Sequence, residues 1–374
     1  MRAVYRLLLN FCLALTVLGA CFVATHAQGL PGSGFPGSTI DAAEGRGVQD
    51  MKLGSVLFFN YYTSDPNNIG SVDTIFNLTN VHPTSDIALH LFFVDSTTCN
   101  VADAFFCLTR NQTSSFRASD IDPGVAGYVI AVAVDSFGRP VSFNALAGDA
   151  MIGTPTGHRF LLPAVVAARR DATAQMPITA SPINSDGQTA TLFFNGAQYD
   201  FLPQTLVLDS FPSQVAGIGA PAGNTALYVY SPLPNLTAPD TFSGSLFFLL
   251  YDDQEHSFSG TMSLNCFLSS SKQRISSVRT TPNVNTIVPS GHTGWASFYG
   301  LGDRTVTSNT AGGTLTLSNF PLMGATATRL GNFNGGHNLR LATTFIGYSI
   351  TIPVFVPNCG TVDAGSVVPN ESNL

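Results

Sequence analysis

Short runs of β-branched and aromatic residues recur from residue 54 to residue 356, each bounded by Gly, Pro, Asn, Asp or Ser. Such runs predict β-strands, and their close spacing is typical of a β-sandwich. A first set of strands is expected at 54–62, 72–79, 87–95, 104–109, 127–134 and 141–146. A second set is expected at 190–195, 205–209, 226–230, 243–251, 255–267, 294–299, 313–319, 339–345 and 348–356.

Two of these segments carry more detail. Residues 128–134 are apolar throughout, as in a strand buried on both faces. Residues 243–267 predict the longest hairpin of the chain, with its turn at Asp252-Asp253-Gln254. The strand pattern lapses between about 151 and 182, where residues 161–173 are rich in alanine and predict a short helix.

The N-terminus has the three parts of a bacterial signal peptide. Arg2 and Arg6 precede an apolar run over 7–23, and small residues follow up to Ala27, where cleavage is expected. The segment Leu18-Gly19-Ala20-Cys21 also fits a lipoprotein signal, in which Cys21 is lipidated. Both routes lead out of the cytoplasm, and a Gly/Pro/Ser-rich tether follows.

Removing residues 1–27 from the 374 leaves 347, which is long for one β-sandwich. We therefore predict an all-β protein with two immunoglobulin-like β-sandwich domains in tandem. The predicted parts are a signal peptide (1–27), a tether (28–50), a first sandwich (51–160), a connection (161–185), a second sandwich (186–360) and a tail (361–374).

Short motifs support this architecture. Asn77-Leu78-Thr79-Asn80, the run 87–95, Ser115-Phe116-Arg117 and the turn over 120–124 precede the strand from Gly127. With them the first domain resembles immunoglobulin-like modules of exported bacterial proteins. The chain also resembles an uncharacterised family of exported bacterial β-rich proteins, in which Gly335-Gly336-His337-Asn338-Leu339 recurs near the C-terminal strands. The resemblance implies a fold and no activity.

Charge excludes one class of partner. Charged residues make up 10% of the chain, against about 25% in ordinary proteins. Once Arg2 and Arg6 leave with the signal peptide, 14 basic residues face 23 acidic ones, so we expect no nucleic-acid partner. The adjacent pair Arg169-Arg170 is expected on a solvated surface.

No residue pattern indicates catalysis or a cofactor. With only three glutamates, Glu44, Glu255 and Glu371, the inventory excludes a glycosidase that uses two glutamates, whereas one that uses two aspartates or an Asp/Glu pair stays open. Asp252, Asp253 and Glu255 form the densest acidic cluster, which we interpret as a solvated hairpin tip rather than a metal site, with calcium as the alternative. His337 is expected in a Gly-Gly loop.

Trp295 is the only tryptophan, and Phe298 and Tyr299 follow it in the same expected strand. Core packing is the favoured role, and an exposed aromatic platform for sugars is the alternative. The sequence thus predicts a secreted or cell-surface, non-enzymatic interaction or structural module of unknown ligand. A carbohydrate-binding or carbohydrate-active protein is the alternative function. Partners would be a glycan or a surface protein, with membrane attachment only through Cys21.

The cysteines complete the prediction. Cys12 and Cys21 lie in the signal region, so cleavage after Ala27 leaves Cys99, Cys107, Cys266 and Cys359. An even number in an oxidising compartment predicts two disulfides, and free, buried thiols are the alternative. We expect Cys99 to pair with Cys107 and Cys266 with Cys359, because each bond then stays within one predicted domain.

Overall fold

The computed structural model describes residues 47–155, 157–171, 180–212, 224–237, 240–268, 288, 292–308, 314–330, 333–342, 344–359 and 367–369. The chain divides into two units, Met1–Asp41 and Ala42–Leu374, and all described residues belong to the second. The predicted signal peptide, most of the tether and most of the tail therefore lie outside the described residues.

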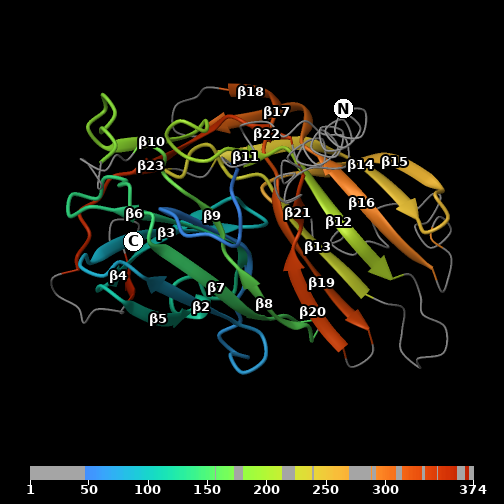
Figure 1. Cartoon of the computed structure of the whole chain (residues 1–374), viewed down its shortest axis with the longest axis horizontal. Coiled ribbons are helices and arrows are strands. Elements are labelled where there is room, and N and C mark those ends of the chain that lie inside the picture. The colour runs from blue at the N-terminus through green and yellow to red at the C-terminus, as the bar shows by residue number, and fades with distance from the viewer. Residues whose placement is uncertain are drawn as a thin grey trace, which may run out of the picture. The chain divides into compact units, whose positions relative to one another are not determined.

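The predicted all-β fold is confirmed. The described residues form several antiparallel sheets, and their one helical element is a single 3-10 turn, Ala118–Asp120 (Figure 1). In this part of the chain no helix has the length and apolar character needed to cross a membrane. The number of immunoglobulin-like domains stays a prediction.

Two sheets pack face to face, and the N-terminal half builds both of them apart from one edge strand, at residues 367–369, in the larger sheet. Rings of Phe59 and Phe93 from one sheet meet Phe76 of the other edge-on, with centroids 5.0 and 5.8 Å apart. The larger sheet has the order β24 (Val367–Pro369), β4 (Val101–Leu108), β3 (Ile87–Asp95), β6 (Ala126–Val134), β1 (Val56–Thr63) and β9 (Val165–Ala167). The smaller has the order β5 (Gln112–Arg117), β2 (Thr74–Asn80), β7 (Leu146–Gly153) and β8 (Arg159–Pro163).

The C-terminal half contains the largest sheet. Its order is β18 (Thr314–Asn319), β17 (Leu301–Ser308), β14 (Asp240–Asp252), β16 (Thr293–Tyr299), β12 (Thr205–Pro212) and β21 (Arg340–Leu341), with β15 (Ser257–Leu264) on the other edge of β14. A three-stranded sheet in this half has the order β13 (Asn224–Tyr230), β19 (Met323–Leu330) and β20 (Phe333–Asn338). Two strand pairs complete the half: β10 (Thr189–Phe194) with β23 (Tyr348–Pro353), and β11 (Leu202–Pro203) with β22 (Phe345–Ile346). The predicted long hairpin is confirmed, because β14 and β15 pair from Gly244 to Tyr251.

The helix expected within 161–173 is wrong for the residues that are described there. They form the end of β8 and all of β9. Pro163 has no amide hydrogen for a helical hydrogen bond, and Val165 and Val166 are β-branched. β9 pairs with β1 and is fully buried, so packing favours the extended chain.

Both halves contribute to one hydrophobic core. Tyr61 of β1 stacks on Tyr228 of β13, and Tyr128 of β6 stacks on Tyr230, each with ring centroids 3.8 Å apart. The Tyr230 hydroxyl also donates to Asn60 Oδ1 at 3.0 Å inside this contact. The predicted boundary at 161–185 stays a prediction, although the two parts pack as one unit.

The four cysteines are paired, but the predicted pairing is wrong. Cys99 bonds to Cys266 and Cys107 to Cys359, with Cα atoms 5.5 and 5.8 Å apart. Cys99 lies in the turn before β4 and Cys107 near the far end of that strand. An extended strand advances about 3.4 Å per residue, which carries these two cysteines well beyond bonding distance. Each bond therefore joins the N-terminal half to the C-terminal half.

Candidate ligand-binding face

The largest sheet has one apolar inner face and one mixed outer face. In β14, Leu246, Phe248 and Leu250 are buried, whereas Phe247 and Tyr251, which alternate with them, are half-buried. In a strand, alternate side chains point to opposite faces, so Phe247 and Tyr251 stand on the outer face. In Figure 1, β15, β14, β16 and β12 run side by side on the right of the view.

Two aromatic pairs cross from β14 to β16 on this outer face. Tyr251 lies directly opposite Trp295, and their rings stack with centroids 4.5 Å apart and an interplanar angle of 9°. Phe247 lies opposite Tyr299, with centroids 5.8 Å apart and rings tilted by 45°. The pairs are four residues apart along β14, which is about 14 Å in a strand.

Polar side chains border both aromatic pairs on the β15 side. Ser257 lies opposite Tyr251, and Thr261 lies opposite Phe247. Both are exposed and point to the same face as the rings they adjoin. Small residues here leave the flank of the Tyr251 ring without a bulky neighbour on β15.

An ion cluster borders the stack on the β12 side. The register of β12 against β16 breaks between Leu208 and Phe211, and this bulge leaves Asp209 and Ser210 together opposite Trp295. Arg340 Nε donates to Asp209 Oδ2 at 2.6 Å, and His337 Nε2 lies 3.3 Å from Asp209 Oδ1. Partial burial raises the pKa of Asp209, but the hydrogen bond and charge of Arg340 outweigh it and hold that pKa below its usual value.

His337 differs from its expected place. The Gly335-Gly336-His337 segment belongs to β20 and pairs with β19, so it is not a loop. Gly335 and Gly336 are therefore residues of β20, and this strand places His337 next to Asp209. Trp295 was singled out from the sequence, whereas Tyr251, Asp209 and Arg340 were not.

The acidic hairpin tip is partly different from its expected form. Asp252 is buried, and its carboxylate accepts the amide hydrogens of Gln254 and His256 and faces His256 Nδ1 at 2.7 Å. Asp253 faces His292 Nδ1 at 2.7 Å. Within the described residues no three metal-ligating side chains gather. Asp252 thus orders the turn, and the expectation that Asp252, Asp253 and Glu255 bind no metal stays a prediction.

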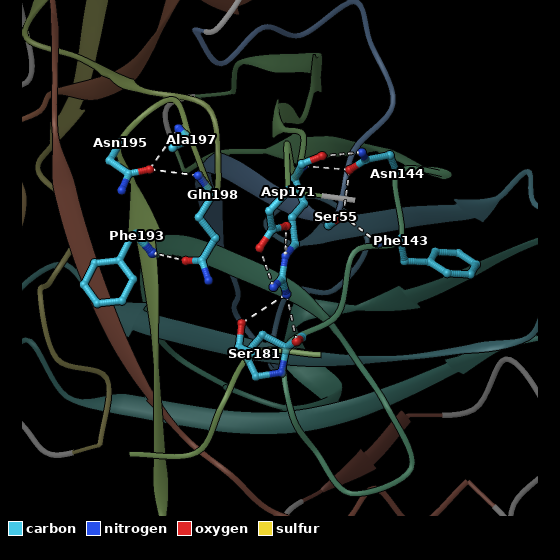
Figure 2. Close-up of polar contacts among 11 residues, drawn as sticks. Ser55, Phe143, Asn144, Asp171, Ser181, Phe193, Asn195, Ala197 and Gln198 are labelled. Atoms are coloured by element: carbon cyan, nitrogen blue, oxygen red, sulfur yellow. Dashed lines mark hydrogen bonds and ion pairs between the residues drawn. The ribbon is translucent and has the colours of Figure 1, made fainter. Parts of the chain in front are cut away.

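The expectation of a solvated Arg169-Arg170 pair is wrong for Arg169, which is 2% exposed. Its guanidinium donates to Asp171, to the Pro140 carbonyl at 3.1 Å and to Ser181 Oγ at 3.0 Å. Figure 2 labels two of these partners, Asp171 and Ser181. It also lies 5.4 Å from the centre of the Tyr199 ring. These contacts join loops of both halves, so Arg169 is structural.

Two further buried groups have the residue types of catalytic sites. The carboxylate of Asp200 is fully buried between Lys52 and Arg170 and also accepts the Ala168 amide hydrogen. His90 Nε2 lies 2.7 Å from Asp103 Oδ2, with both side chains buried and the imidazole stacked on Phe105. His90 Nδ1 has no hydrogen-bond partner, so no nucleophile is placed against this imidazole in the described structure.

Comparisons with known proteins found no matching family model, no matching curated protein and no matching solved structure.

Proposed function

We propose that this chain is an exported, non-enzymatic interaction module that binds its partner through the outer face of β12, β14, β15 and β16. The observation that carries the proposal is the Tyr251–Trp295 stack, which is half-buried on that face beside exposed polar groups. Large aromatic side chains are enriched at binding surfaces because they bury much area with few rotatable bonds.

Export is supported by the cysteines. Two disulfides fit an extracellular location, because the cytoplasm keeps thiols reduced. Cleavage after Ala27 and lipidation of Cys21 are both consistent with such a location, giving a secreted or a surface-anchored protein respectively.

The non-enzymatic part is supported by how the ionisable groups are used. Lys52 and Arg170 both contact Asp200, and the His90–Asp103 pair is buried among phenylalanines. A catalytic group must reach its substrate, whereas these groups mainly satisfy one another.

Binding to intact cells of the producing organism tests the proposal. Purified, labelled mature protein should bind the cell surface or the extracellular matrix, and Trp295→Ala should lower this binding about tenfold or more. Phe137→Ala is the matched control, because Phe137 is 62% exposed in the loop after β6, a strand of a different sheet. Equal binding of the Trp295→Ala variant and the parent would contradict the proposal.

A further inference from the structure

We infer that the ligand of this outer face is an uncharged polysaccharide chain that lies along β14 and β16 and contacts both aromatic pairs. The inference rests on the proposed function, because it takes this face as the binding surface. It adds the chemical class, the length and the charge of the ligand.

The chemical class follows from what lies next to the rings. A pyranose ring with equatorial hydroxyls has an apolar C–H face and a polar rim, so it needs aromatic carbon beneath it and hydrogen-bonding groups around it. Tyr251 and Trp295 cover one ring face of each other, and the other face of Tyr251, beside the small Ser257, supplies the aromatic carbon. Ser257 on one side and Asp209 with Arg340 on the other supply donors and acceptors.

The length follows from the register. Tyr251–Trp295 and Phe247–Tyr299 are separated by about 14 Å along the strands, which exceeds the width of one pyranose ring. A single sugar therefore contacts one pair only. A chain of several sugars contacts both pairs, and Leu249 and Ser297 lie between them on the same face.

The charge follows from the whole chain and from the site. After signal cleavage the acidic residues exceed the basic ones, 23 against 14, which opposes an anionic chain. Arg340 on this face is already bound to Asp209 at 2.6 Å. An anionic polysaccharide would have to compete with that carboxylate, whereas neutral hydroxyls can hydrogen-bond to the pair as it stands.

Trp295 is the only tryptophan of the chain, so its fluorescence reports this face alone. The mature protein is titrated with cellohexaose, xylohexaose, chitohexaose and laminarihexaose, with the matching monosaccharides and with anionic polygalacturonate. We expect at least one hexasaccharide to change the emission and to bind about tenfold or more tightly than its monosaccharide. Polygalacturonate should bind more weakly than that hexasaccharide.

Titration calorimetry of variants measures how much each of the two aromatic pairs contributes to saccharide binding. Trp295→Ala should weaken hexasaccharide binding at least tenfold, and Phe247→Ala should weaken it towards the affinity of the monosaccharide. Phe137→Ala should bind as the parent does. Each variant is first shown to unfold at the temperature of the parent or close to it. A variant that misfolds is replaced by Trp295→Gln or Phe247→Gln, each carrying the same expectation.

The outcomes separate the two proposals. If no neutral hexasaccharide binds while cell binding still requires Trp295, the glycan inference is wrong and the interaction face stands. If neither assay depends on Trp295, both are wrong. Equal affinity for monosaccharide and hexasaccharide, or tighter binding of polygalacturonate, overturns the assignment of an extended, uncharged chain.

Discussion

At the scale of single residues, a buried and an exposed arginine allow a direct comparison. Arg169 is buried and donates to the Pro140 carbonyl and Ser181, whereas the side chain of Arg340 is 72% exposed. Arg169→Met leaves buried acceptors without donors, so it should lower the free energy of unfolding by about 2–3 kcal/mol. Arg340→Met should cost less than about 1 kcal/mol, as for exposed ion pairs.

Urea denaturation of the two variants and the parent measures this difference. A loss for Arg169→Met no larger than for Arg340→Met would mean that the buried contacts around Arg169 add nothing to stability.

His90 should make stability depend on pH. Burial lowers the pKa of His90 and outweighs the hydrogen bond and charge of Asp103, which raise it. Above pH of about 6.5 the imidazole is neutral in both the folded and the unfolded chain. As the pH falls below that value the unfolded chain binds a proton that the folded chain does not, so the protein loses stability until the lowered folded-state pKa is passed.

Replacing His90 by Gln removes this contribution, because the amide does not titrate and still donates to Asp103. Melting temperatures at pH 7.5, 6.5 and 5.5 should fall for the parent and fall less steeply for His90→Gln. Carboxylates also lower the melting temperature of both proteins as the pH falls. The readout is therefore the difference in melting temperature between the parent and His90→Gln at each pH. Parallel curves would contradict the prediction.

The candidate face was only partly predictable at this scale. The sequence indicates Trp295 as a candidate because it is the only tryptophan. Its neighbours Tyr251 and Asp209 come from other strands, and only the register brings them together. The run from Leu246 to Tyr251 is apolar throughout, so the sequence pattern does not indicate which of its side chains face outward.

At the scale of elements, most strands with apolar and aromatic runs were predicted, and β3 agrees at both ends. Two of the missed strands are rich in polar residues or glycine, since β5 reads Gln-Thr-Ser-Ser-Phe-Arg and β20 contains Gly335-Gly336, whereas β8 and β9 are apolar and fall where a helix was expected. The strand structure of β5 and β20 comes from pairing with β2 and β19, which adds hydrogen bonds that local propensity does not predict.

A glycine in the loop after β6 provides an element-scale prediction. Gly138 has φ of +79°, and a Cβ there would lie 1.8 Å from the Phe355 carbonyl oxygen. Gly187 has a similar φ of +73° but no atom within 4 Å of such a Cβ. Gly187→Ala should cost roughly 1–2 kcal/mol from the backbone alone, and Gly138→Ala should cost clearly more because the loop must also shift.

Thermal melting of both alanine variants tests this. Equal losses of melting temperature would show that the loop moves away from Phe355 at no cost.

At the scale of the whole molecule, the disulfides and the shared core make the two halves dependent on each other. The bonds span sequence separations of 167 and 252 residues. Closing loops of this length restricts the unfolded chain strongly, so replacing either pair by serine should lower stability by about 2–5 kcal/mol. Both disulfides should therefore contribute to stability by similar amounts. In the pairing expected from the sequence, the Cys99–Cys107 bond would close only a short loop and contribute less.

Peptide mapping without reduction should find Cys99 linked to Cys266 and Cys107 linked to Cys359, and calorimetry of the two double-serine variants should give lower melting temperatures than the parent. A Cys99–Cys107 peptide would contradict the structure. The sequence predicted that disulfides form but not which ones, since the pairing depends on β4 holding its ends apart and on packing between distant segments.

The interleaved order of the two bonds also decides how the molecule bears load. Tension between an N-terminal attachment and a ligand held at Trp295 follows the shortest covalent route, which leaves the backbone at Cys99 and rejoins it at Cys266. Residues 100–265 are then outside the line of force. A pull along this route cannot extend β12, β14 or the strands β4 and β6, which all lie between the two cysteines, whereas β1 and β3 precede Cys99 and carry the load. If the protein is anchored at its N-terminus, residues 100–265 would therefore add no length to it under tension.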